Sequence, residues 1–217
     1  MRKLKMYKNK TPGLLITFCG LDGCGKTTQI NLLKEYFTKL NIDFYLTKQP
    51  TDAVRRSEIF RTYMDSPDHS SYEYRSLSLL AASDRLQHVS KVIRPELEKK
   101  KTVICDRYFY SCLANLRARG YKDDKWIYGV SESVIEPDLA FFIDVPVETA
   151  VSRVRSRPEE AERYIDMDLQ YKLRREYIDI CRRNNGILIP YGMTVEKCFE
   201  TIKNEIDKVI EKWKTAE

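Results

Sequence analysis

A glycine-rich segment that ends in Lys-Thr is the first part of the chain whose residue types could do chemistry. From residue 20 to residue 27 it fits the pattern G-x-x-x-x-G-K-[ST], and it directly follows an apolar, strand-like run. Glycines let backbone N–H groups turn around a phosphate, Lys26 can reach the β and γ phosphates of a nucleotide, and the Thr27 hydroxyl can bind Mg²⁺. The pattern therefore predicts ATP and Mg²⁺ as ligands. The residues expected to surround the phosphates are Gly20, Leu21, Asp22, Gly23, Cys24, Gly25, Lys26, Thr27 and Thr28.

Two opposite charges, Asp106 and Arg107, follow the apolar run 102–105. Burying either charge alone would be costly, and ligands of α/β folds bind at the carboxyl ends of the strands. We therefore expect Asp106 to help hold Mg²⁺ and Arg107 to bind a phosphate. A mutual salt bridge or a helix cap is the structural alternative.

A cluster of arginines flanks the segment 158–160, Pro-Glu-Glu, where one predicted helix ends and another begins. Such a segment could close over phosphates as a lid, supply positive charge to a transferring phosphoryl group and exclude water. A solvated face with Arg–Glu pairs is the alternative when the segment is considered alone. A phosphate loop elsewhere in the chain favours the lid. The cluster consists of Arg153, Arg155, Arg157 and Arg163.

The elements that must position these residues are indicated by apolar runs. Nearly continuous runs of strand length occupy 14–19, 44–47, 102–105, 139–144 and 187–189, as expected for strands buried on both faces of a parallel sheet. Apolar residues at helical spacing occupy 26–40, 72–100, 147–157, 161–183 and 195–213. The alternation predicts an α/β doubly wound fold with a five-stranded parallel sheet.

Length and charge limit the remaining possibilities. A chain of 217 residues is expected to form one domain over 13–217, preceded by a flexible basic N-terminal tail over 1–12. The net charge of +6 is too small and too dispersed to indicate binding of a nucleic-acid polymer. No apolar run approaches the ~20 residues that span a bilayer, and no signal-peptide pattern follows the basic start, so we expect a cytoplasmic protein. The six cysteines contain no Cys-x-x-Cys pair, which favours neither a zinc site nor a disulfide framework.

Four segments together resemble the thymidylate kinase family of nucleoside monophosphate kinases, over nearly the whole chain from Leu14 to about Ile206. They are 18–28, similar to the family's P-loop; 79–89, similar to its central helix; 103–108, similar to its Asp-Arg-Tyr strand end; and 137–146, similar to its fourth strand. The resemblance implies the three-layer P-loop NTPase fold with helices on both sides of the sheet and a short Arg-rich lid. It also implies a homodimer paired through helices.

The resemblance assigns expected roles to single residues. Asp22 would bind the 3′-hydroxyl of the acceptor sugar, Arg107 would bridge the donor and acceptor phosphates, and Arg85 would reach an exocyclic oxygen of a pyrimidine. Taken alone, Arg85 would more often be a solvated helical residue. Arg61 resembles the family's acceptor-phosphate arginine. Gly23 stands where some members carry a catalytic arginine, so the chain is similar to the bacterial-type members whose arginine comes from the lid. The candidates are Arg157 and Arg163.

Several positions depart from the family pattern. Ala81 stands where a phenylalanine usually stacks on thymine, and Asn115 stands where an aromatic residue usually crowds the 2′ position of the sugar. An aromatic side chain such as Tyr72, Tyr74 or Phe109 could compensate for the missing ring. Gln49 and Thr51-Asp52 replace the usual Glu and Gly-Gly around Pro50, and Cys19 replaces an acidic residue before the P-loop.

These observations favour ATP-dependent phosphorylation of a nucleoside monophosphate, with dTMP to dTDP as the expected instance. One alternative is a relative that acts on another pyrimidine or modified nucleotide, such as UMP, dUMP or dCMP. A nucleoside kinase is less favoured, because Arg61, Arg85 and Arg107 supply more cations than a neutral acceptor needs. A nucleotide-binding regulatory or scaffold protein without turnover is the alternative from another class.

Overall fold

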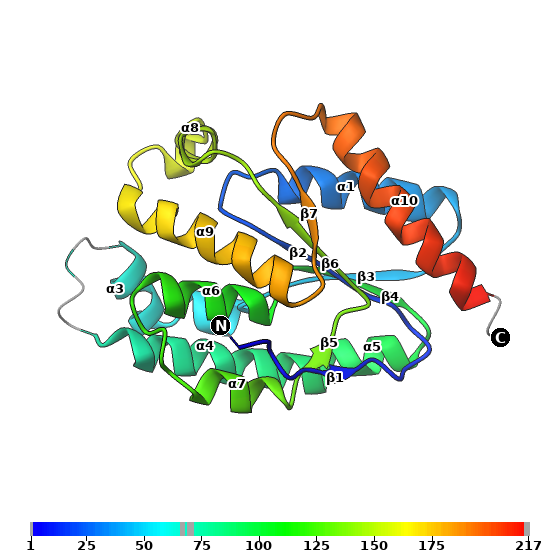
Figure 1. Ribbon diagram of the computed structural model, residues 1–217, viewed down its shortest axis with the longest axis horizontal. Helices are drawn as coiled ribbons and strands as arrows, with labels where there is room; N and C mark the ends of the chain where they lie inside the picture. The colour runs from blue at the N-terminus through cyan, green and yellow to red at the C-terminus, as the bar shows by residue number, and fades with distance from the viewer. Residues whose placement is uncertain (1, 66–67, 69–71, 215–217) are drawn as a thin grey trace.

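The computed structural model describes residues 2–65, 68 and 72–214, and its centre is a five-stranded sheet (Figure 1). The strands are β2 (Leu15–Cys19), β3 (Phe44–Lys48), β4 (Thr102–Asp106), β6 (Leu139–Ile143) and β7 (Ile187–Ile189). Their spatial order is β3-β4-β2-β6-β7, and every pairing is parallel. The predicted α/β class and five-stranded parallel sheet are confirmed. Continuous apolar runs identified these strands because β2 and β6 are buried along their whole length.

The register of the sheet brings the ends of its central strands together. Phe18 of β2 lies opposite Asp106 of β4 on one side and opposite Phe141 of β6 on the other. Because parallel strands end at the same edge of a sheet, the segments that follow β2, β4 and β6 meet there.

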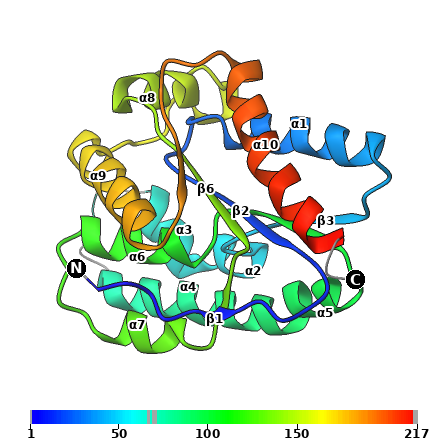
Figure 2. The ribbon, with the colours of Figure 1, turned by 45° about the vertical axis from the view of Figure 1, so that its right-hand side comes forward.

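Helices cover both faces of the sheet (Figures 1 and 2). On one face, α1 (Lys26–Lys39) packs beside α10 (Val195–Lys214). The other face carries α4 (Tyr74–His88), α5 (Arg94–Glu98), α6 (Phe109–Ala118) and α9 (Met167–Arg183). A π-helical turn (Val89–Ile93) joins α4 to α5, so the predicted helix over 72–100 is nearly continuous. The expected three-layer arrangement is therefore present.

Four helices were not predicted from the sequence. They are α2 (Asp52–Arg55), α3 (Glu58–Asp65), α6 and α7 (Trp126–Ser131). α2, α3 and α7 are shorter than the window of about 11–18 residues over which a helical period is judged. α6 is buried on nearly every side, so it lacks the polar face that makes an amphipathic helix visible in a sequence.

The expected lid lies between α8 (Val147–Arg155) and α9, and its second helix starts later than predicted. The spacing predicts a helix from residue 161, whereas α9 begins at Met167. The Asp166 carboxylate caps this helix by accepting a hydrogen bond from the backbone N–H of Leu169 at 3.0 Å. Between the helices, Pro158–Glu160 forms a single 3-10 turn, which leaves 161–166 as non-helical chain.

The N-terminal segment differs from the expected solvated tail. Leu4 is only 3% exposed, and its backbone N–H donates to Asn184 Oδ1 at 3.0 Å. Residues Tyr7–Lys8 form β1, which pairs in parallel with β5 (Ile135–Glu136) in a separate two-stranded sheet. The apolar side chains between the basic residues supply contacts that charge composition alone did not reveal. Met1 of the expected tail, and 66–67, 69–71 and 215–217 of the expected domain, lie outside the described residues.

All six cysteines are free, and five of them are buried. Among residues 2–65, 68 and 72–214, no helix has the length and apolar character needed to cross a membrane.

Candidate active site

One cavity of about 1030 Å³, here called the main cavity, lies where the segments after β2, β4 and β6 meet. With the exception of Gly20, every site residue predicted from the sequence lines it. These residues are Leu21, Asp22, Gly23, Cys24, Gly25, Lys26, Thr27, Thr28, Arg61, Ala81, Arg85, Asp106, Arg107, Asn115, Arg157 and Arg163. The fold therefore gathers segments from across the chain into one volume that is large enough for two small ligands.

The glycine-rich loop between β2 and α1 is held tightly against α8. Gly23 has φ of 78°, and a Cβ built on it would lie 2.1 Å from the carbonyl oxygen of Ala150. A side chain at this position would need both a strained backbone and a displaced helix. The structure thus has no room at Gly23 for the arginine that some members of the resembling family carry.

Lys26, the first residue of α1, lies within the loop and is only 6% exposed. Its Nζ donates hydrogen bonds to the carbonyl oxygens of Leu21 at 2.7 Å and Gly20 at 3.3 Å. These contacts hold the ammonium group inside the turn of the loop. Thr27, the next residue, is exposed toward the main cavity.

Arg107 follows β4 with φ of 67°, a left-handed conformation that is unusual for a residue other than glycine. Its Nη2 donates to Asp22 Oδ1 at 2.6 Å and its Nη1 to Tyr177 Oη at 2.8 Å. The Tyr177 hydroxyl in turn donates to Ser111 Oγ at 3.0 Å. The charged partner of Arg107 is therefore Asp22, and the helix-cap and Asp106 salt-bridge alternatives are not what the structure shows.

The charge state of Asp22 follows from this contact. The Arg107 guanidinium, more than any other group, holds the pKa of Asp22 well below its usual range. Asp22 is therefore a carboxylate that can accept hydrogen bonds but not donate them. Burial raises the pKa of the neighbouring Cys19 thiol to about 12, so Cys19 supplies no negative charge in place of the acidic residue that the family pattern has there.

Asp106 provides the cavity with a carboxylate that is only partly satisfied. Its Oδ2 lies 3.7 Å from Lys48 Nζ, while its Oδ1 is buried and has no hydrogen-bond partner among the described residues. A buried oxygen without a hydrogen-bond partner costs free energy unless a ligand supplies that partner. Asp106 and the Thr27 hydroxyl are oxygen ligands of the kind that Mg²⁺ prefers. In the described part of the chain, no group of three or more His, Cys, Asp or Glu side chains is arranged to hold a metal ion.

The lid arginines differ in what they contact. Arg163 Nη2 lies 3.5 Å from Asp22 Oδ2, and its Nη1 donates to Glu160 Oε2 at 2.9 Å. Arg153 Nη1 donates to the carbonyl oxygen of Gly23 at 3.4 Å. Arg157 is exposed and lines the main cavity, whereas the exposed Arg155 does not. The Arg–Glu pairing considered for a solvated face exists at Arg163, but the same side chain also reaches the glycine-rich loop.

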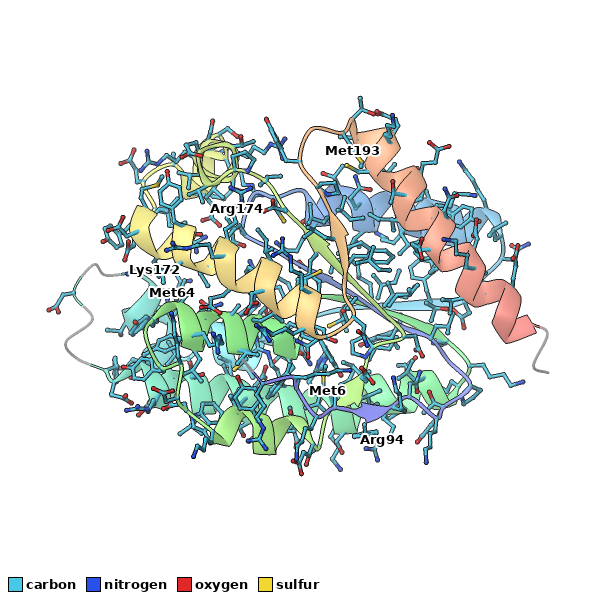
Figure 3. All side chains as sticks on the ribbon, in the orientation of Figure 1. Met6, Met64, Arg94, Lys172, Arg174 and Met193 are labelled. Atoms are coloured by element: carbon cyan, nitrogen blue, oxygen red, sulfur yellow. The ribbon has the colours of Figure 1, made fainter. Side chains whose placement is uncertain are left out.

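The helices on either side of the lid are fixed to the sheet and to each other. Arg174 of α9 makes two hydrogen bonds to the Asp144 carboxylate at the end of β6, at 2.7 and 2.9 Å. Figure 3 labels Arg174 beside α9 and Met193 near the start of α10. The Tyr171 hydroxyl donates to Glu148 of α8. The segment between α8 and α9 therefore connects two helices whose positions are fixed by these contacts.

The side of the main cavity away from the glycine-rich loop is formed by α3, α4 and α6. Arg85 is buried, with 3% of its surface exposed, so it is not the solvated helical residue that it would be on average. Its Nη1 donates to the carbonyl oxygen of Ala81 at 2.8 Å, and its Nε is buried without a partner among the described residues. Arg61 is exposed on α3. The Arg85 guanidinium thus has donor capacity left for a ligand.

An arginine occupies the region where the family pattern has an aromatic ring. Arg119 Nη1 donates to Asn115 Oδ1 at 2.8 Å, and its guanidinium lies 4.2 Å from the centre of the Tyr74 ring. Tyr63 also contacts this guanidinium. Of the three aromatic residues considered as replacements for the ring missing at Ala81, Tyr74 lines the main cavity, while Tyr72 and Phe109 do not.

Sequence reasoning missed several residues of the cavity. They are Arg55, Tyr63, Arg119 and Tyr177, and Arg153 was placed in the lid but not assigned a site role. Arg55 and Tyr63 lie on the short helices α2 and α3, whose existence the pattern did not show. Tyr177 has the spacing of a core residue on α9, so only its hydroxyl, directed to Arg107, reveals its position at the site.

Comparison with known proteins identifies related sequences that match most of the chain. The family model described as thymidylate kinase matches residues 18–205. A probable thymidylate kinase of Thermococcus kodakarensis is 36% identical over 203 residues, which cover 91% of this chain and 97% of that protein. Proteins of the same description from Pyrococcus horikoshii and Methanocaldococcus jannaschii are 41% identical over 170 residues and 32% identical over 193 residues. The alignments cover 77% and 89% of this chain, and 82% and 93% of those proteins.

Proposed function

Because the chain belongs to the thymidylate kinase family of ATP-dependent nucleoside monophosphate kinases, we propose that it phosphorylates dTMP to dTDP with the groups gathered in the main cavity. The family does not favour the alternatives of another pyrimidine acceptor or of a regulatory protein without turnover. The observation that carries the proposal is the position of the Arg107–Asp22 pair, which joins the glycine-rich loop to the end of the neighbouring strand.

Each charged group has a place in this transfer. Lys26 would bind the β and γ phosphates of ATP, since its ammonium group lies inside the loop. Arg107 would lie between the donor and acceptor phosphates and relieve their repulsion. Asp22 would accept a hydrogen bond from the 3′-hydroxyl of the sugar. Arg85 would donate to an exocyclic oxygen of the base, with the donor capacity that its buried Nε retains.

The remaining arginines would act on phosphate. Arg61 would bind the phosphate of the acceptor, while Arg157 and Arg163 would engage the transferring phosphoryl group when the lid closes. Alignment of the acceptor oxygen with the γ-phosphorus and neutralisation of the charge on the transferring group are nearly all that phosphoryl transfer requires. No nucleophilic side chain of the protein is needed.

Thr27 and Asp106 would hold Mg²⁺, together with oxygens of the phosphates and water. The fit rests on the exposed Thr27 hydroxyl and on the buried Asp106 Oδ1, which lacks a partner among the described residues. When bound, Mg²⁺ supplies charge that neutralises the developing negative charge of the phosphates.

Two further proposals rest on the family resemblance alone. We propose a homodimer paired through helices, which sedimentation of the purified protein would detect as twice the mass of one chain. We also propose a cytoplasmic location, which fractionation of the source cells would test.

A coupled ADP-release assay with a panel of acceptors tests the proposed function. The purified protein receives ATP and Mg²⁺ with dTMP, dUMP, UMP or dCMP, or with no acceptor, and the rate of ADP release is measured. We expect the highest kcat/KM with dTMP. Lys26→Ala should keep the fold and lose transfer, because Lys26 supplies charge to the phosphates and little packing. Wild-type turnover by this variant would remove the glycine-rich loop from the mechanism, and ADP release that is independent of every acceptor would exclude a monophosphate kinase.

A further inference from the structure

Arg55 is a cation of the main cavity whose presence the sequence pattern did not indicate. It is the last residue of α2, and it lines the same cavity as Arg85, Arg107 and Asp106. Its side chain is half-buried, unlike that of the next residue, Arg56, which is exposed. An arginine that lines a cavity can bind a phosphate there through the planar set of N–H donors of its guanidinium.

The hydrogen bonds of Arg55 occupy only part of its guanidinium. Nε donates to the carbonyl oxygen of Pro50 at 2.7 Å, and Nη2 donates to that of Gln49 at 3.4 Å. Nη1 donates to no residue that the structure describes. A guanidinium carries five N–H donors in a fixed plane. The group is therefore oriented by the backbone along one edge and retains donors for an anion.

The backbone that orients Arg55 is itself held in place. The Asp84 carboxylate of α4 accepts hydrogen bonds from the backbone N–H of Thr51, at 2.8 Å, and from the Thr51 hydroxyl. The backbone N–H of Gln49 donates to the carbonyl oxygen of Asp106 at 3.0 Å, and the Gln49 amide contacts His88 Nδ1 at 3.1 Å. A donor fixed in this way loses little entropy when a ligand binds.

The charges around Arg55 leave its own charge unpaired within the described residues. Arg56 forms an ion pair with Asp52 at 3.0 Å, whereas Arg55 forms none with any described carboxylate. Burial, followed by the positive charge of Arg107, lowers the pKa of Arg55, and the negative charges of Asp22 and Asp106 only partly oppose this shift. Arg55 and Arg107 therefore repel each other across the cavity. A doubly negative phosphate between them would relieve this repulsion and make charge-assisted hydrogen bonds to both.

We propose that Arg55 binds the phosphate group of the acceptor nucleotide and shares it with Arg107. The inference rests on the proposed function and adds a residue to the acceptor site. Arg61, the arginine expected to bind this phosphate, lies on the exposed side of α3, while Arg55 is nearer to being buried and is oriented by fixed carbonyl groups. Arg55 would fix the orientation of the acceptor phosphate, and Arg61 would contribute from the rim of the cavity.

The experiment separates the phosphate of the acceptor from its nucleoside. Calorimetry measures the dissociation constants of dTMP, thymidine and ADP for the wild type and for Arg55→Ala, Arg55→Lys and Arg56→Ala. We expect Arg55→Ala to weaken dTMP binding by roughly 10- to 100-fold, the loss of a charge-assisted hydrogen bond, and to leave thymidine and ADP within about twofold. Arg55→Lys should recover part of the dTMP affinity. Arg56→Ala is the matched control, and it should bind all three ligands as the wild type does.

Each other outcome has a defined meaning. Unchanged dTMP affinity in Arg55→Ala overturns the inference, while acceptor turnover by the wild type leaves the proposed function standing. Equal losses for dTMP and thymidine also overturn it, because Arg55 would then act on the nucleoside or on the fold. Equal losses for dTMP and ADP would place Arg55 on the donor side. Absence of turnover with every acceptor in the wild type would instead contradict the proposed function. The dTMP and thymidine affinities do not depend on turnover, so they test the role of Arg55 separately.

Discussion

Arg107 and Asp22 lie 85 residues apart in the sequence, yet Arg107 Nη2 is 2.6 Å from Asp22 Oδ1. The pair connects the glycine-rich loop after β2 with the end of β4, and Asp22 also receives Arg163 from the lid. The glycine-rich loop, the end of β4 and the lid thus share one carboxylate. A change in any one of these three segments is therefore expected to alter the contacts of Asp22 with the other two.

Arg107→Ala should lower kcat by roughly 10²- to 10³-fold, because a cation between two phosphates stabilises charge that develops during transfer. Steady-state kinetics with ATP and dTMP measure the effect, and Arg107→Lys is the control that retains the charge but cannot reach both Asp22 and Tyr177. A rise in KM for ATP with kcat unchanged would make Arg107 a ground-state binder and contradict its assigned role.

Replacement of Arg157 and Arg163 together should depress kcat more than nucleotide affinity, since a lid arginine engages the transition state only after closure. The single variants are expected to show smaller losses, because each cation can partly replace the other. Kinetics of Arg157→Ala, Arg163→Ala and the double variant, compared with calorimetry of ADP binding, separate the two quantities. Arg155→Ala is the matched control, since Arg155 does not line the main cavity. Normal turnover by the double variant would leave Arg153 as the lid cation to test.

Gly23→Ala should destabilise the protein more than Gly25→Ala does. Both glycines have positive φ, at 78° and 103°, and an L-residue in such strained backbone costs on the order of 1–3 kcal/mol. Only at Gly23 would the new Cβ also meet the Ala150 carbonyl oxygen, at 2.1 Å, whereas nothing lies within 4 Å of a Cβ at Gly25. The difference between the two free energies of unfolding, measured in denaturant, reports the contact with α8. Equal free energies would mean that α8 moves away without cost.

The altered acceptor pocket should discriminate dTMP from UMP and dUMP less strongly than a pocket with both aromatic residues. Ala81 and Asn115 replace two rings of the family pattern, and a stacked ring contributes roughly 1–3 kcal/mol. Ala81→Phe with Asn115→Tyr should restore part of the preference, measured by competition between acceptors. Because Asn115 Oδ1 holds Arg119, the single Asn115→Tyr variant is needed to separate release of Arg119 from the new wall. Strict dTMP selectivity in the unmodified protein would show that Tyr74 and Arg119 already perform both roles.

The parts of the site that follow long buried strands could be predicted from the sequence. Lys26 and Arg107 were expected at one site, and both line the main cavity, because each follows a continuous apolar run and adjacent parallel strands end at the same edge. The glycine pattern further fixed the identity of the loop. Each of these signals comes from neighbouring residues in the chain, and the parallel sheet then brings the ends of β2 and β4 together in space.

The residues contributed by short or fully buried helices could not be predicted. Arg55 and Tyr63 lie on short helices that the sequence pattern did not show, and Arg119 follows α6, which has no polar face. The pairing of Arg107 with Asp22 was also missed, because the sequence of neither segment indicates which distant charge will be its partner. Residues 1–12 were assigned to a tail because five of the first ten residues are basic, yet the buried side chain of Leu4 and the pairing of β1 with β5 dock the segment.

The docked N-terminal segment constrains the order in which the chain can assemble. The backbone N–H of Leu4 donates a hydrogen bond to Asn184, which is 180 residues away. Tyr7 must wait for Ile135 before β1 can pair. Residues 4–8 therefore cannot reach their final position until residues 135 and 184 are present, and closing so long a loop carries an entropic cost that only the nearly complete fold offsets.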